Sequence, residues 1–136
     1  MIELINTAEQ TVEVGQSVVY NAVAVHSTCG RERHREGSAF ITLLPPGRYL
    51  VTFSGNIAVP TGETVGEVSL GITQNGEVLG GSLMRATPAA VEEYFNVSTQ
   101  HYVDTYCNCC VDVGVRNTSG IPVLVDNPNI TVVRVC

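Results

Sequence analysis

Residues 39–57 read AFITLLPPGRYLVTFSGNI and carry the clearest structural signal in the chain. The Pro-Pro-Gly cluster at positions 45–47 separates two apolar runs, which predicts a turn that sends the chain back on itself. After this turn apolar and polar residues alternate, so that Tyr49, Val51 and Phe53 share one face of an extended segment. A period of two is typical of a strand with one buried side. The stretch therefore predicts two strands joined by a turn.

Similar alternation and turn chemistry extend over the rest of the chain. The run Glu67–Gln74 alternates and ends at Asn75-Gly76, a dipeptide typical of hairpin turns. Many short strands separated by such turns favour an all-β sandwich or barrel. We expect about ten strands, at Glu3–Ile5, Gln10–Val14, Ser17–Val25, Ala39–Leu43, Tyr49–Ala58, Glu67–Gln74, Glu77–Arg85, Asn96–Val103, Cys110–Asn117 and Val123–Val125 leading to Ile130–Val135.

One segment, Thr87–Tyr94, has the features of a helix. Thr87 is a favourable N-cap and Pro88 suits the first helical position, with two glutamates soon after. A segment of this length predicts a single helical turn that links two strands.

Length and composition favour one globular domain over residues 1–136. Charged residues make up 15% of the chain, against about 25% in typical domains, which suggests that copies of the chain cover part of its surface. All seven basic side chains are arginines and the net charge is -6, which argues against nucleic-acid binding through a basic surface. We find no signal peptide and no apolar run of about 18 residues, so we expect neither secretion nor a membrane span.

A polar segment, Ser27–Gly37, interrupts the strand pattern and holds three of the seven arginines. Its arginines alternate with Glu32, His34 and Glu36, so that in extended form the arginines share one face and His34 lies on the other. Arginine forks bind carboxylates bidentately, so an anion clamp is one interpretation. A solvated loop, or a set of ion pairs that joins one subunit to the next, is the interpretation we favour. The candidate interface or binding residues are Arg31, Arg33, His34 and Arg35.

The five cysteines, Cys29, Cys107, Cys109, Cys110 and Cys136, are candidates for buried thiols or for disulfide bonds. A zinc site built from His26, Cys29, Cys107, Cys109 and Cys110 is the alternative. We do not favour it, because zinc modules repeat cysteine pairs at other spacings. We expect no metal and no other cofactor.

No sequence motif indicates catalysis. The chain has no nucleophile elbow, phosphate loop or HExxH helix. A metal enzyme of the cupin type would need clustered histidines, and His26, His34 and His101 do not have that spacing. We therefore expect a protein that is not an enzyme.

The sequence resembles two groups of proteins. Residues 37–53 and 68–76, with their Pro-Gly-Tyr turn and Asn-Gly hairpin, resemble the jelly rolls of tumour necrosis factor and of complement globular heads. The chain also resembles small jelly-roll proteins encoded by phages and prophages of gut Firmicutes. This second likeness covers nearly the whole chain and is carried by Asn6–Val12, His34–Ser38, Gly55–Gly62, Thr87–Glu92 and Cys109-Cys110.

The resemblance implies a two-sheet antiparallel jelly roll, similar to tumour necrosis factor, that assembles as a homotrimer. It further implies a virion structural protein, such as a capsid decoration or head-fibre module, that is assembled in the bacterial cytoplasm and contacts capsid or other virion proteins. We expect no collagen-like or coiled-coil stalk ahead of the jelly roll, in contrast to the first group. The alternative is an adhesion head that binds a host receptor or surface glycan through the loops Ser27–Gly37 and Pro60–Gly66.

Overall fold

Two antiparallel six-stranded sheets form the protein in the computed structural model, which describes residues 1–105 and 109–136. Their strands are β1 (Ile2–Ile5), β2 (Gln10–Val12), β3 (Ala22–Val25), β4 (Glu32–His34), β5 (Ile41–Leu43), β6 (Gly47–Ala58), β7 (Val68–Gln74), β8 (Glu77–Val78), β9 (Met84–Ala86), β10 (Phe95–Thr105), β11 (Val111–Asn117) and β12 (Val123–Arg134).

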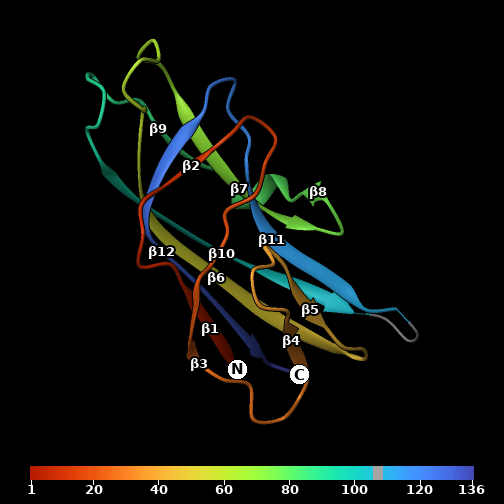
Figure 1. The fold of residues 1–136 in the computed structure, drawn as a ribbon. Coiled ribbons are helices and arrows are strands. Elements are labelled where there is room, and N and C mark those ends of the chain that lie inside the picture. Colours follow the sequence, from red (N-terminus) through yellow and green to blue (C-terminus); the bar gives the residue numbers. More distant parts are fainter. Residues whose placement is uncertain (106–108) are drawn as a thin grey trace.

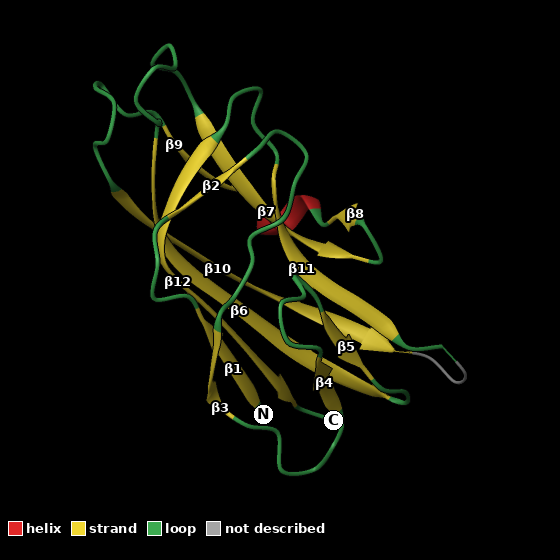
Figure 2. Ribbon diagram, viewed as in Figure 1, coloured by secondary structure: helices red, strands yellow, loops and turns green. Residues whose placement is uncertain are grey.

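The sheets lie in two layers (Figure 1). Sheet A has the strand order β10-β6-β12-β1-β3, with β2 also pairing with β12. Sheet B has the order β4-β5-β11-β7-β8, with β9 also pairing with β7. Figure 2 shows one short helical turn, η1 (Gly80–Ser82), in the part of the chain that the structure describes. Within those residues no helix is long and apolar enough to cross a membrane.

Strand β6 confirms the alternation in the sequence. Tyr49, Val51 and Phe53 are fully buried, whereas Leu50 and Thr52 are only partly buried on the opposite face. β6 pairs with β10 on one side and with β12 on the other. It is therefore an inner strand of sheet A whose two faces have different surroundings.

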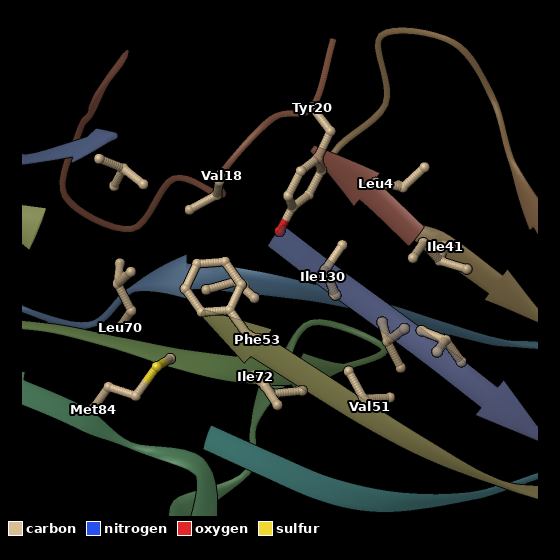
Figure 3. Packing of buried hydrophobic residues seen from close by; sticks show 14 of the residues in the cluster. Leu4, Val18, Tyr20, Ile41, Val51, Phe53, Leu70, Ile72, Met84 and Ile130 are labelled. Atoms are coloured by element: carbon tan, nitrogen blue, oxygen red, sulfur yellow. The ribbon is translucent and has the colours of Figure 1, made fainter. Parts of the chain in front are cut away.

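The core lies between the two sheets (Figure 3). Phe53 and Ile130 of sheet A meet Leu70 and Ile72 of sheet B there, and all four side chains are fully buried. Burying such a side chain contributes about 1.5–3 kcal/mol, which makes this layer the main source of stability.

The predicted strand Ser17–Val25 is confirmed only at its end, where β3 covers Ala22–Val25, because the residues before β3 cross from one layer to the other. Near its start, the Val18 amide donates to the Val115 carbonyl of sheet B at 2.8 Å. At its end, β3 pairs with β1 in sheet A. Between these points the side chain of Gln10 donates to the Val19 carbonyl and accepts from the Val19 amide. These two hydrogen bonds take the place of those that a neighbouring strand would make.

The predicted strand Glu77–Arg85 is confirmed only in part, because the turn η1 interrupts it between β8 and β9. The two glycines at 80 and 81 favour a break, since glycine weakens a strand. Ser82 then fixes the turn, because its hydroxyl accepts from the Ile72 amide at 2.9 Å and donates to the Leu79 carbonyl at 2.6 Å.

The predicted helical turn at Thr87–Tyr94 is absent, and the segment forms bends and a turn instead. Glu92 has a φ of 57°, in the left-handed region, and its amide donates to the Val59 carbonyl at 2.8 Å. The Tyr94 hydroxyl donates to the carboxylate of Glu9. A single helical turn is unstable alone, so these contacts with other segments decide its conformation.

The last two predicted strand pieces form one strand, β12. The register of its pairing with β6 shifts between Asp126 and Asn129, which accounts for the turn-like sequence at this point.

Two buried tyrosines allow a matched test of the core. The Tyr20 hydroxyl points into the interior in Figure 3 and has no hydrogen-bond partner among the described residues, whereas the Tyr49 hydroxyl donates to the Leu44 carbonyl at 2.7 Å. We expect Tyr20→Phe to raise the free energy of unfolding by about 1 kcal/mol and Tyr49→Phe to lower it by about 1 kcal/mol. Urea unfolding at pH 7 measures both, and the opposite signs would contradict this packing.

The same residue predicts a pH dependence. Burial raises the pKa of Tyr20 above its ordinary value of 10.0. The unfolded chain then loses this proton first, so the contribution of Tyr20 to the free energy of unfolding is fully present well below pH 10 and is lost as the pH rises further. We expect Tyr20→Phe to make this fall shallower in urea unfolding between pH 9 and about 11. An unchanged slope in the variant would contradict the burial of the hydroxyl.

Candidate functional site

The segment Ser27–Gly37, predicted as a loop, contains the edge strand β4 of sheet B. Glu32 in this strand is buried, and its carboxylate accepts a hydrogen bond from Ser27 at 2.8 Å and pairs with the Met1 amino group at 2.9 Å. A buried carboxylate needs such partners, because an unpaired charge is costly. With Glu32 turned inward, the neighbouring Arg33 faces outward and is exposed.

A row of polar side chains crosses the outer face of sheet B at this edge. Arg33 on β4 pairs with Thr42 on β5, and Thr42 pairs with Asp112 on β11. The Thr42 hydroxyl donates to Oδ1 of Asp112 at 2.7 Å. The backbone of Asp112 is also held, since it exchanges hydrogen bonds of 2.8 and 2.9 Å with Asn75. These pairings place a cation and an anion on either side of a threonine.

An aromatic ring lies beside this row. Phe40 precedes β5, and its ring packs over Gly114 of β11, where an added Cβ atom would lie 2.8 Å from Cδ1 of Phe40. A glycine at 114 therefore gives the ring room to lie against the sheet. Phe40 as a residue remains 38% exposed, so the ring is not covered by the sheet alone.

These residues line a surface hollow of about 500 Å³, which we call the arginine hollow. Its lining comes from β4, β5, β11 and residues that adjoin these strands, and consists of Arg33, His34, Arg35, Ser38, Phe40, Thr42, Leu44, Cys110 and Asp112. Two arginines against one aspartate give it a positive balance in a chain of net charge -6.

The four predicted interface residues do not all lie in the same place. Arg33, His34 and Arg35 line the arginine hollow, whereas Arg31 donates to the Pro45 carbonyl at 3.2 Å. His34 is fixed by a contact of 2.9 Å between Nε2 and the Ser38 carbonyl. The sequence analysis missed Phe40, Thr42 and Asp112, because their proximity to Arg33 depends on strand pairing across distant segments.

The predicted cysteine and metal residues do not form a site in the described part of the chain. Cys29, Cys109, Cys110 and Cys136 are free and exposed. Cys107 lies outside the described residues. Within residues 1–105 and 109–136 no three His, Cys, Asp or Glu residues are placed to hold a metal. His26 instead lines a separate hollow of about 370 Å³ with His34 and Glu36.

A second surface lies on the outer face of sheet A, on the opposite layer. Three rows cross β10, β6 and β12 there, and every side chain in them is uncharged. The rows, which we call the neutral face, are Tyr102–Leu50–Val133, Gln100–Thr52–Thr131 and Ser98–Ser54–Asn129.

Charges border the neutral face. Arg48 and Asp104 form an ion pair with an N–O distance of 2.6 Å at one end of it, and the Arg48 guanidinium lies 5.9 Å from the Tyr102 ring centre. On the neighbouring strand β1, the Glu3 carboxylate accepts a hydrogen bond from the Asn129 amide. Tyr102 itself is 58% exposed. The face therefore presents an aromatic and two aliphatic side chains inside a polar surround.

No family model matches the chain, and no curated protein sequence does either. Solved structures do resemble it. The globular domain of zebrafish complement 1qA protein superposes with a TM-score of 0.68 at 12% identity, covering 96% of this chain and 94% of that one. The Eiger TNF from S. frugiperda superposes with a TM-score of 0.72 at 10% identity, covering 100% and 92%.

These similarities identify the architecture. The predicted all-β, two-sheet antiparallel jelly roll is confirmed, with a fold similar to those of tumour necrosis factor and complement globular heads. At such low identities the likeness extends to the fold alone.

The exposed thiols lead to a direct prediction. We expect iodoacetamide to modify Cys29, Cys109, Cys110 and Cys136 in the native protein without reductant, because all four are free and exposed. Peptide mass spectrometry identifies the modified positions. Protection of any of these four cysteines that is removed by a reductant would show a disulfide and contradict this arrangement.

Proposed function

We propose that the protein is a non-enzymatic structural module that assembles as a homotrimer through the neutral face and forms part of a phage particle, as a capsid decoration or head-fibre component. The observation that carries the proposal is the absence of charge from three successive rows of an outward-facing sheet surface.

Such a surface suits contact with sister chains. The centres of protein interfaces are depleted of charged residues and enriched in aromatic ones, with polar groups at the rim. Tyr102, Leu50 and Val133 supply the apolar anchor, and the Ser, Thr, Asn and Gln side chains of the other rows supply hydrogen bonds. The Arg48–Asp104 pair lies where a polar rim is expected.

A closed ring of three chains would cover the neutral face of every subunit. The neutral face is made from a single sheet and cannot be covered within its own chain. In a cyclic trimer each chain presents this face toward a common axis, and closed symmetry limits the assembly to a defined size. The low share of charged residues in the chain, 15%, supports the same arrangement.

The virion role is supported by the sequence likeness to phage and prophage jelly rolls, which spans segments from Asn6–Val12 to Cys109-Cys110.

The trimer has a mass test. We expect size-exclusion chromatography with light scattering at micromolar concentration to give three times the chain mass of 14.5 kDa. Thr52→Arg places a charge at the centre of the neutral face and should release monomer, because burying an unpaired charge is costly. Thr61→Arg, in an exposed turn outside that face, should leave the trimer intact. A monomeric wild-type protein would contradict the proposal.

The particle role has a separate test. We expect peptide mass spectrometry of phage particles, purified from the bacterium that carries the gene, to detect this chain in a copy number divisible by three. A chain abundant in the lysate but absent from purified particles would contradict the virion role while leaving the trimer unaffected.

A further inference from the structure

We propose that the arginine hollow binds an acidic saccharide, that is, a pyranose ring bearing a carboxylate. This activity goes beyond the structural role proposed above. Three features of the hollow each match one part of such a ligand: the arginines match its carboxylate, Asp112 its hydroxyl groups and Phe40 its apolar ring face.

The carboxylate partner comes from Arg33 and Arg35. Both side chains are exposed, and neither makes a hydrogen bond or an ion pair with any residue that the structure describes. Their guanidinium donors are therefore available to a ligand. Arginine binds carboxylates through paired N–H donors, and charge-assisted hydrogen bonds of this kind are about twice as strong as neutral ones.

The hydroxyl partner is Asp112. Its Oδ1 accepts from Thr42, and within the described ranges its Oδ2 has no hydrogen-bond donor. An ionised carboxylate only accepts hydrogen bonds, so it selects a ligand that carries donors. Sugar hydroxyls are such donors. A bare phosphate ion offers few donors to this oxygen at neutral pH.

The apolar partner is the exposed side of the Phe40 ring. One face of a pyranose is lined by C–H bonds and suits contact with a flat aromatic surface. The ring needs no rearrangement to offer this surface, since it already packs over Gly114. Leu44, partly buried, lies at the same outer face and extends the apolar lining.

The hollow lies on sheet B, in the layer opposite the neutral face on sheet A, so covering the neutral face does not itself cover the hollow. A trimer then presents three copies of the hollow. Multivalent presentation raises the apparent affinity of a weak site for a repeated ligand such as a surface polysaccharide.

Methyl β-glucuronide is the probe of choice, with methyl β-glucoside and inorganic phosphate as comparisons. In NMR titrations of the ¹⁵N-labelled protein, we expect the glucuronide to shift the amide signals of Arg33, Thr42 and Asp112, with an affinity at least tenfold higher than either comparison compound. Equal affinity for phosphate would reduce the hollow to a simple anion site and overturn the proposal. Equal affinity for the glucoside, or no shifts with the glucuronide, would also overturn it.

Variants separate the contributions. We expect Arg33→Gln and Phe40→Ala each to weaken glucuronide binding about tenfold or more, since each removes one of the matched contacts. Arg85→Gln changes an exposed arginine on β9, outside the hollow, and should leave affinity unchanged. Equal weakening by Arg85→Gln and Arg33→Gln would indicate a general charge effect and contradict the site. Thr52→Arg tests whether glucuronide binding is independent of trimer formation. This monomerising variant should keep the affinity of a single hollow.

Discussion

Strand β6 contributes one face to the core and the other to the neutral face, and the remaining structure depends on this constraint. One face of the strand carries Tyr49, Val51 and Phe53, which are completely buried between the sheets. The opposite face carries Leu50, Thr52 and Ser54, which lie in the middle of the neutral face. Because side chains alternate along a strand, a shift of one residue in register would exchange the two sets. Pairing of β6 with both β10 and β12 fixes that register.

Local patterning was sufficient for β6 and β7, although it divided the long strand β12 in two. The period of two and the Pro-Gly and Asn-Gly turns predicted β6 and β7 to within two residues of their observed bounds. Patterning failed where long-range contacts decide the backbone. Ser17–Val25 is apolar enough for a strand, yet hydrogen bonds to both sheets make it a crossing segment. Thr87–Tyr94 has helix-capping residues, yet the Glu92 amide donates a hydrogen bond to the Val59 carbonyl of a distant segment.

In the candidate site, too, the local sequence pattern predicted some residues, whereas others are brought in only by strand pairing. Alternation in the arginine segment identified Arg33 and Arg35 as side chains of one face. The partners that turn them into a hollow come from β5 and β11, and only the pairing of Arg33 with Thr42 and of Thr42 with Asp112 brings them together. The charged residues have a second effect as well. β4 is an edge of sheet B, and an exposed arginine on an edge strand discourages pairing with other chains.

Hydroxyl-radical footprinting of Tyr102 tests the central claim most directly, namely that sister chains cover the outer face of β6 and its neighbours. Tyr102 is 58% exposed in a single chain, and the fully buried Tyr49 serves as an internal reference. We predict that Tyr102 is oxidised about as slowly as Tyr49 at micromolar concentration and much faster in Thr52→Arg. Rapid oxidation of Tyr102 in the wild-type protein, at the rate seen in the variant, would contradict the account.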